Sequence, residues 1–417
     1  MIKYERRILA NGLTVLAHTD GSTPMASVNV LYKVGSKNEN PDATGFAHLF
    51  EHLMFGGSKN VPDFDTPIQE AGGENNAFTN NDYTNYYITL PKENIQTALW
   101  AESDRMASLN FDERSLDVQR KVVVEEFAQR YLNQPYGDTW LLLRPLCYKV
   151  HPYQWSTIGK SIDHIRGASM EQVRAFFYRY YCPANAILSI AGNFSTDEIF
   201  ELAERWFSDI PSSAAPQDVI EQEPVQTEQR ILVVERDVPS SMIYIAFPIG
   251  GRATREYVVC DVISDLLSNG TSSRLYQRLI KQKSLFSSVN AYVTGEIDAG
   301  LFVLTGSLLD GVSFEVAQKA LLQQMEELKS VAVSDYELQK VKNKFEANDI
   351  YSQINVLSKA MNLAFFEFVG DASLINAEVS DHNSVTQEEI FATCATLFTP
   401  EHSNILHYQA KPTDENR

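Results

Sequence analysis

Two histidines and a glutamate stand close together in the segment GFAHLFEHLMFGG, residues 45–57. On a helix, His48 and His52 are four residues apart and project from one face, near enough for both imidazoles to bind one metal ion. Glu51 lies on the same face, three residues after His48. A catalytic zinc ion keeps one position for water, and a nearby carboxylate accepts the water's proton. The motif therefore indicates a zinc hydrolase with two histidine ligands and Glu51 as general base.

The same HxxEH pattern also arises by chance on polar helix faces, so its context matters. Phe46, Leu49, Phe50 and Leu53 fill the rest of this segment, and we expect the helix to be buried against a sheet. Buried histidines and carboxylates need partners that offset their lost hydration, and a metal ion supplies them. The context therefore favours metal binding. Nitrogen and oxygen ligands also accept manganese and cobalt, so zinc is an expectation from the geometry of the motif.

A closed metal site needs a third protein ligand. The segment QRKVVVEEF, residues 119–127, places two adjacent acids, Glu125 and Glu126, on an apolar helix. Glu126 faces the same way as Gln119, whereas Glu125 is about 100° round the helix. The residues alone leave the choice between the two acids open. The remaining histidines lack metal-ligand spacing, and we expect them to be ordinary polar or core residues: His18, His151, His164, His382, His402 and His407.

The composition is that of a globular protein with more than one domain. A length of 417 residues exceeds one ordinary core, and the 44% hydrophobic and 21% charged residues suit a folded chain. A net charge of −19 repels phosphate backbones and anionic lipids, so nucleic acid and membrane surfaces are poor partners. The same charge attracts basic peptides.

The cysteine spacing, the first residues and the apolar runs argue against a disulfide framework, a sulfur zinc site and a membrane span. Cys147, Cys182, Cys260 and Cys394 form no CxxC pair, so we expect buried free thiols. The first residues lack the apolar core of a signal peptide, and no run reaches the roughly 18 apolar residues of a membrane span. We therefore expect a cytoplasmic protein, or a periplasmic one if a signal peptide has been removed.

The pattern of elements is repeated along the chain. Alternation predicts strands at 13–18 and 27–33 before a helix at 44–55, and strands at 231–235 and 242–248 before a helix at 257–268. An offset of 213 residues, from Gly57 to Gly270, sets Asp261, Ser264 and Asp265 against the HxxEH residues. The sequence therefore predicts a duplication in which the second copy has lost the histidines.

Long helices and runs of strands indicate an α+β fold, with helices packed on one face of a largely antiparallel sheet in each half. The helices are expected at 93–108, 113–132, 170–181, 314–329 and 336–355. A Pro-, Ser- and acid-rich stretch, Pro211 to Gln229, reads as a linker. We predict a catalytic domain at residues 1–211, a linker at 212–229 and a non-catalytic repeat domain at 230–417.

Beyond these patterns, the chain resembles the pitrilysin/insulinase family of zinc peptidases, which includes the mitochondrial processing peptidase. The similarity covers most of the chain and is carried by NGLTVLAH, HLFEHLMFGGSKN, EAGGENNAFT, DYTNY, VVVEEF, YCPAN and GNF. In the family, a ligand glutamate follows HxxEH by seventy-odd residues, and here Glu126 follows His52 by 74. The resemblance implies zinc held by His48, His52 and Glu126, with Glu51 as base.

The resemblance also implies how a substrate would bind. Two chains, or two halves, would close around a peptide that pairs as an added strand with a sheet edge. Selection would rest on an unfolded stretch more than on a strict sequence motif. The expected substrate contacts are Asn76, Ala77, Phe78 and Thr79.

Two departures from the family pattern bear on function. Gln119 stands where a glutamate is frequent, which removes a negative charge near the metal. In the second half, Ile280 and Ser287 stand where the family often has an Arg and a Tyr that hold the substrate carbonyl and the transition state; Lys281 and Arg278 are nearby but out of register. We therefore expect a homodimer or a heterodimer in which a family-like partner supplies the Arg/Tyr pair.

Two other functions remain open from the sequence. One is an inactive scaffold or assembly subunit of the same family, which would have no reason to keep two histidines and a glutamate on one face. The other is a zinc hydrolase that acts on something other than peptides. A panel of peptides and small esters would separate these functions.

Overall fold

The computed structural model describes residues 1–211 and 213–412, which divide into two compact units. Unit 1 consists of Met1–Gln129, Trp155–Glu221 and Asp349–Ala377. Unit 2 consists of Arg130–Gln154, Gln222–Asn348 and the chain from Glu378 onward. Each unit therefore contains a segment from the other half of the sequence.

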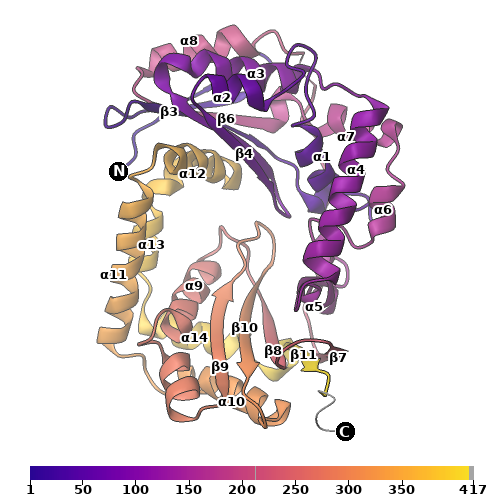
Figure 1. The fold of residues 1–417 in the computed structure, drawn as a ribbon. Coiled ribbons are helices and arrows are strands. Elements are labelled where there is room, and N and C mark those ends of the chain that lie inside the picture. The colour runs from indigo at the N-terminus through magenta and orange to yellow at the C-terminus, as the bar shows by residue number, and fades with distance from the viewer. Residues whose placement is uncertain (212, 413–417) are drawn as a thin grey trace. The chain divides into compact units, whose positions relative to one another are not determined.

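Unit 1 is built on a six-stranded sheet with the order β1-β2-β6-β3-β5-β4 (Figure 1). Neighbouring strands are antiparallel except β2 and β6, which are parallel. The strands are β1 (Glu5–Ile8), β2 (Thr14–Thr19), β3 (Met25–Tyr32), β4 (Glu74–Thr79), β5 (Thr84–Pro91) and β6 (Ala186–Gly192). Consecutive residues of β3 and β6 are buried, so both sheet faces are covered.

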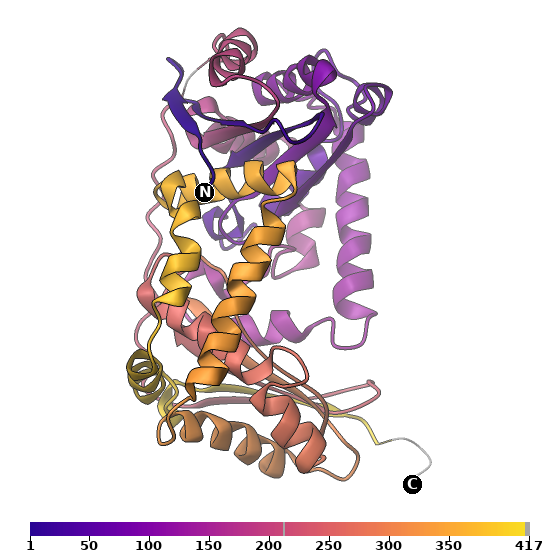
Figure 2. The same cartoon turned by 90° about the vertical axis from the view of Figure 1, so that its left-hand side faces the viewer.

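Helices cover the two faces of this sheet from different parts of the chain. Helices α3 (Ile95–Ala107) and α8 (Thr196–Phe207) pack together on one face. Helix α12 (Val356–Val369) lies against β3 and β6 on the other face, as Figures 1 and 2 show. There Leu363 and Ala364 share a core with Leu16. The remaining helices of unit 1 are α1 (Phe46–Leu53), α2 (Asp65–Glu70), α4 (Glu113–Phe127), α6 (Ile162–Arg166) and α7 (Met170–Tyr180).

An ion pair also holds α12 to unit 1. Lys359 Nζ lies 2.7 Å from Asp20 Oδ2, and both side chains are largely buried. Burial raises the pKa of the Asp20 carboxyl, but hydrogen bonds from Lys359 and Ser22 outweigh it and lower the pKa to about 2. The pair therefore stabilises the docked helix while Asp20 is ionised.

A second buried ion pair lies within α3. Arg105 is 1% exposed and donates from Nε to Glu102 Oε2 at 2.8 Å. The guanidinium also lies 4.2 Å from the ring centre of Phe64 and 4.3 Å from that of Tyr86. Glu102 is 0% exposed, so each charge depends on the other for compensation.

Unit 2 repeats the sheet of unit 1 without β1. Its order is β7-β11-β8-β10-β9, again with one parallel pair, β7 and β11. In chain order its five strands match β2, β3, β4, β5 and β6, and they occupy the same places in the sheet. The strands are β7 (Arg230–Arg236), β8 (Met242–Ile249), β9 (Phe286–Val293), β10 (Gly300–Leu308) and β11 (Asn404–Ala410). The duplicated α+β architecture that the sequence indicates is therefore present.

Helices again cover both faces of the second sheet, so the predicted packing of helices on only one face of each sheet is wrong. Helices α9 (Arg255–Ser268), α10 (Phe314–Leu328) and α14 (Gln387–Leu397) share one core with β8 and β10. Helix α5 (Thr139–Cys147), from the N-terminal half of the sequence, covers the opposite face. Unit 2 also contains α13 (Glu378–Asn383) and a π-helical turn, Tyr276–Gln282. Helix α11 (Asp335–Ser352) begins in unit 2 and ends in unit 1.

The predicted domain division at residues 211 to 230 stays a prediction. Segments from each side of it enter the other compact unit. Residues 213–229 contain no helix or strand, as expected of a linker, and Ser212 lies outside the described residues.

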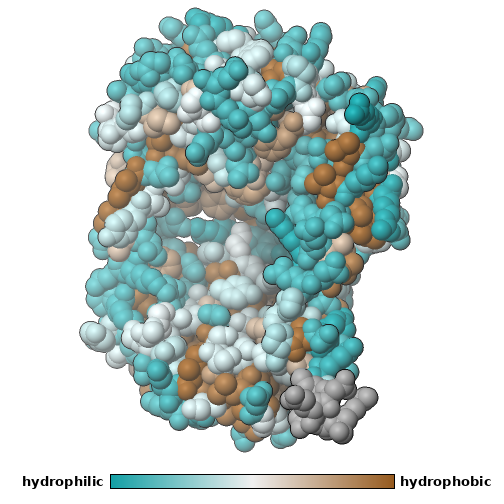
Figure 3. Space-filling view, viewed as in Figure 1, coloured by the Kyte–Doolittle hydropathy of each residue, from teal (hydrophilic) through white to brown (hydrophobic). Residues whose placement is uncertain are grey.

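The face drawn in Figure 3 is largely hydrophilic with scattered hydrophobic patches. Within the described ranges, no helix combines the length and apolar character needed to cross a bilayer.

Candidate metal centre

The centre is built on α1, a short helix whose apolar residues are buried in unit 1. The N-cap of the helix is Gly45, which has a positive φ of 89° and offers no side chain to cap the first turn. A Cβ at this position would lie 2.6 Å from Ile165 Cδ1 and 2.7 Å from Ile158 O, so only glycine fits. The N–H groups of the first turn therefore need an acceptor from elsewhere in the chain.

Glu39 supplies that acceptor. Its Oε2 accepts the N–H of Gly45 and its Oε1 accepts the N–H of Ala47, both at 2.8 Å. The residue is 6% exposed. Burial raises the pKa of its carboxyl to about 8, although the hydrogen bonds from Ala47 and Gly45 act to lower it. Glu39 thus fixes the first turn of the helix, in which Ala47 directly precedes His48.

The candidate metal ligands meet where α1 packs on α4. They are His48, His52 and Glu126. Glu126 Oε2 lies 3.7 Å from His48 Nε2 and 3.3 Å from His52 Nε2. One donor atom from each residue lies within 4.8 Å of the others, and no second group of this kind occurs among the residues that the structure describes. All three side chains are partly buried.

These separations fit a zinc ion. Two ligands at 2.0–2.2 Å from one tetrahedral ion are about 3.3–3.6 Å apart. The His52–Glu126 distance of 3.3 Å agrees with this range, and the His48–Glu126 distance of 3.7 Å is slightly longer. Two imidazole nitrogens and one carboxylate oxygen are also the ligand types of catalytic zinc sites that keep a fourth position open. The residues present therefore suit the metal that the motif implies.

The structure places the two adjacent acids of α4 differently. Glu126 points toward the histidines, whereas Glu125 is exposed and accepts a hydrogen bond from Gln129 at 3.0 Å. Gln119, two turns earlier on the same helix, is partly buried. The geometry therefore favours Glu126 as the third ligand of a metal ion.

Glu51 lies on α1 with the two histidines and is partly buried. Burial raises the pKa of its carboxyl, and the nearby Glu126 adds to this, while hydrogen bonds from Thr79 and the proximity of His52 lower it. The pKa of Glu51 is thus shifted toward neutral pH, and a general base is most effective when its pKa lies near the working pH.

Thr79 belongs to β4, which also carries the other expected substrate contacts: Asn76, Ala77 and Phe78. β4 is the last strand of its sheet and, within the described residues, pairs only with β5. α1 contacts β4. A free sheet edge therefore runs beside the HxxEH helix.

The expected departures lie in unit 2. Ile280 is in the π-helical turn and packs against the hydrophobic core, and the Ser287 hydroxyl on β9 donates to Ser307 O at 3.3 Å. Arg278 is held by Glu327 and by Gln324 of α10. Ile280 and Ser287 therefore offer no substitute for the arginine and tyrosine that the family resemblance leads us to expect at these positions.

Unit 2 uses the positions that match the histidines for another purpose. Asp261, at the place of His48, has its Oδ2 3.1 Å from Nε2 of the buried His382. Burial lowers the pKa of His382, but the bond to Asp261 and one to the Glu378 carbonyl raise it overall. Asp265, at the place of His52, accepts from Asn269. These acids tie α9 to α13 and to its own last turn.

The sequence missed Glu39, because no spacing rule links a loop acid to a helix that starts seven residues later, at Phe46. The available signal was the helix itself, whose first turn has only glycine at its cap and so requires a distant acceptor.

Comparison with known proteins matches both halves of the chain. The model described as "Insulinase (Peptidase family M16)" matches residues 14–136, and that described as "Peptidase M16 inactive domain" matches residues 167–345. The first range contains His48, Glu51, His52 and Glu126, and the second contains none of them.

Individual relatives agree with this match. The "Zinc protease PqqE" of Helicobacter pylori is 32% identical over 347 residues, which cover 82% of this chain and 78% of that protein. The mitochondrial-processing peptidase subunit beta of Saccharomyces cerevisiae is 25% identical over 357 residues, 81% of this chain and 76% of that one. The crystal structure of a protease from Helicobacter pylori superposes with a TM-score of 0.93 at 28% identity, covering 99% of this chain and all of that one.

Proposed function

The chain belongs to the insulinase family of peptidases, family M16, and we propose that it is a zinc metalloendopeptidase that hydrolyses unstructured peptides. The observation that carries the proposal is the convergence of His48, His52 and Glu126 beside Glu51. A zinc ion held by the first three would polarise a substrate carbonyl and lower the pKa of a bound water.

The chain's own residues supply the proton transfer and its orientation. Glu51 accepts the proton of the attacking water on its carboxylate and returns it to the nitrogen of the leaving amine. Its hydrogen bonds with Thr79 fix the carboxylate relative to β4. Glu39 holds the start of α1, so the direction of the His48 ring is set before substrate arrives.

The edge of β4 supports a peptide substrate in particular. An extended peptide would pair with the free backbone of residues 76–79 as an added strand. This pairing reads backbone groups and requires an unfolded segment. Because the chain has a net charge of −19, a basic peptide is the better first substrate.

We expect this chain to be the metal-bearing subunit of a homodimer or heterodimer. Ile280 and Ser287 leave unit 2 without the Arg/Tyr pair expected from the family, so the charge that develops on the substrate carbonyl lacks that stabilisation. A family-like partner would supply it. The relative from Saccharomyces cerevisiae is itself named as a subunit.

An inactive scaffold of the same family is the second candidate function. The description "inactive domain" belongs to the match over residues 167–345, which lies outside the metal centre. The favoured function therefore remains the enzyme, and measured metal content separates the two.

The test compares the purified protein with His48→Ala, Glu126→Gln and Glu51→Gln variants, using metal analysis and cleavage of an unstructured basic peptide. We expect about one zinc per chain, with metal reduced by the first two changes and retained in Glu51→Gln, which loses cleavage. Zinc without cleavage by the wild-type protein would call for assays with a partner subunit. No bound metal after zinc is offered would refute the enzyme and favour the scaffold.

A further inference from the structure

The linker, residues 213–229, is attached to unit 1 through one acidic side chain. The residues on either side of Asp218 are exposed, whereas the side chain of Asp218 itself is only 14% exposed. Its Oδ2 accepts a hydrogen bond from Asn38 Nδ2 at 2.7 Å and one from the Tyr180 hydroxyl at 3.0 Å. Its Oδ1 accepts from Arg179 Nη2 at 2.5 Å. Asp218 therefore joins the linker to two separate segments of unit 1.

These two segments form the walls of a pocket of about 240 Å³. One wall is α7, which carries Arg179 and Tyr180, and the other is the loop of residues 38–43, which begins with Asn38. Because side chains do not fill the space between the walls, packing leaves the loop room to shift toward α7. The hydrogen bonds that bridge the walls limit this shift.

Tyr180 takes part in the same bridge. Its hydroxyl lies 3.0 Å from the Asn38 carbonyl oxygen as well as 3.0 Å from Asp218 Oδ2, so both acceptors share its one hydrogen. Burial and the charge of Asp218 raise the pKa of Tyr180, so the hydroxyl remains protonated. The ion pair with Arg179, whose side chain is 58% exposed, contributes little by itself. The carboxylate bond to Asn38 therefore carries most of the bridge.

Both walls support the metal-binding helix α1. Glu39 follows directly in the loop and accepts two N–H groups at the start of α1, one of them from Ala47. On the other wall, Phe176 of α7 stacks on Phe50 of α1 with ring centres 5.0 Å apart. His48 lies on α1 between Ala47 and Phe50, the residues that these supports hold. A change in the spacing of the walls would therefore move His48.

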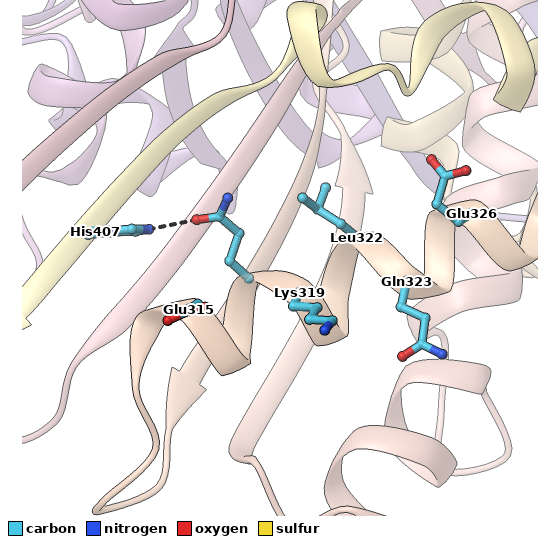
Figure 4. A pocket seen from close by; sticks show the side chains of 7 residues that line it. Glu315, Lys319, Leu322, Gln323, Glu326 and His407 are labelled. Atoms are coloured by element: carbon cyan, nitrogen blue, oxygen red, sulfur yellow. Dashed lines mark hydrogen bonds between the residues drawn. The ribbon is translucent and has the colours of Figure 1, made fainter.

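A pocket of unit 2 shows a bridge that needs only its own walls. This pocket of about 570 Å³ lies between α10 and β11 (Figure 4). His407 Nε2 of β11 lies 3.1 Å from Gln318 Oε1 of α10, so the walls bond directly to each other. In unit 1, by contrast, a residue of a third segment completes the bridge. Unit 2 contains none of the candidate zinc ligands, which makes its bridge a matched comparison.

From the bonds of Asp218 to both walls, and the contacts of both walls with α1, we infer that Asp218 is a positioning residue for the metal centre. It holds the loop that carries Glu39 at a fixed distance from α7, and thereby fixes the first turn of α1. The linker is thus part of the support of the zinc ligands. The inference rests on the proposed function, because it assigns the linker a role at that same site.

The test measures two properties of Asp218→Ala in the full-length protein. Zinc affinity is measured on folded protein by competition with a chromophoric chelator. We expect binding about 3–10-fold weaker than wild type, because Asp218 acts one contact farther from the ligands than the groups that orient them directly. Hydrogen exchange is followed by mass spectrometry in metal-free protein, and peptides covering residues 39–50 should exchange faster than in wild type.

Three further variants show whether Asp218 acts through the loop. Asp218→Asn keeps an acceptor oxygen for Asn38 and should recover at least half of the lost affinity on a logarithmic scale. Asn38→Ala should weaken zinc binding, and adding Asp218→Ala to it should cause less than a further twofold loss, because both changes break one bridge. Gln318→Ala removes the bridge of unit 2 and should leave both measurements unchanged.

The outcomes separate this inference from the proposed function. Zinc affinity in Asp218→Ala equal to that of wild type would overturn the inference and leave the proposed function intact; faster exchange with unchanged affinity would assign Asp218 to stability alone. Fully additive losses in Asp218→Ala and Asn38→Ala, or an equal loss in Gln318→Ala, would also overturn it. Absence of zinc from the wild-type protein would refute the proposed function, and with it any role of Asp218 at a metal centre.

Discussion

Replacing Glu39 with alanine should weaken zinc binding although no zinc ligand is changed. The carboxylate accepts the N–H groups of Gly45 and Ala47 at the start of α1, and the residue is 6% exposed. Without it, two buried donors lose their acceptor, and the first turn, which contains His48, is free to shift.

The structure sets the size of the effect. A buried donor without a partner costs about 1–3 kcal/mol, so two cost about 2–6 kcal/mol. Part of this is offset because burial already disfavours the ionised carboxyl, whose pKa is raised to about 8. We expect a loss of about 2–4 kcal/mol in the free energy of unfolding, and about half of that for Glu39→Gln, which keeps one acceptor oxygen. Zinc affinity should fall about 10–100-fold, as for other groups that orient metal ligands.

The assay separates folding from metal binding. Unfolding by denaturant is measured in the presence of chelator, and zinc affinity by competition with a chromophoric chelator on folded protein. The matched control is Glu223→Ala in unit 2, whose carboxylate accepts the N–H groups of Lys149, Val150 and His151 at 2.8–2.9 Å. It should lose stability and keep its zinc affinity. If Glu39→Ala also keeps the wild-type zinc affinity, Glu39 does not position the metal helix.

Other predictions concern the buried charges and the catalytic base. Asp20→Asn should cost about 1–2 kcal/mol of unfolding free energy at neutral pH, after allowance for solvent screening. The folded pKa of Asp20, about 2, lies below the ordinary 3.8, so the difference in unfolding free energy from wild type should vanish as the pH falls from about 4 to 2. The difference for Lys359→Met should vanish over the same pH range. Glu102→Gln should cost about 3–5 kcal/mol in denaturant unfolding, because its buried arginine loses compensation. Thr79→Val should shift the acidic limb of the kcat/KM profile to higher pH, because the lost hydrogen bond no longer lowers the pKa of Glu51; an unchanged limb would exclude that role.

Much of the fold could be predicted because the apolar patterns are local. The expected strand at 27–33 is β3 (Met25–Tyr32), and the expected helix at 314–329 is α10 (Phe314–Leu328). The helix expected at 113–132 is α4 to Phe127, followed by a π-helical turn at Ala128–Leu132, because the periodicity alone does not distinguish the two kinds of helix.

The exchange of segments between the units could not be predicted from these patterns. Leu363 and Ala364 mark an apolar face on α12, but nothing in their spacing says which sheet they cover. Position along the chain favoured the nearer sheet, and the structure uses the farther one. The choice of the third ligand could not be made from the residues for the same reason, because Glu125 and Glu126 differ only in the neighbours that the fold brings to them.

The exchange has a consequence for the order in which the protein is made. The sheet of unit 1 is fully synthesised once β6 leaves the ribosome, but the helix that covers one of its faces ends only at Val369. At about 5–20 residues per second, that face waits on the order of ten seconds or more for its cover. During this interval Leu16, Leu31 and Ile187, which share a core with α12 in the finished fold, lack that cover. A ribosome stalled within residues 222–348 would therefore leave the metal-bearing unit incomplete, although every one of its candidate zinc ligands had already been made.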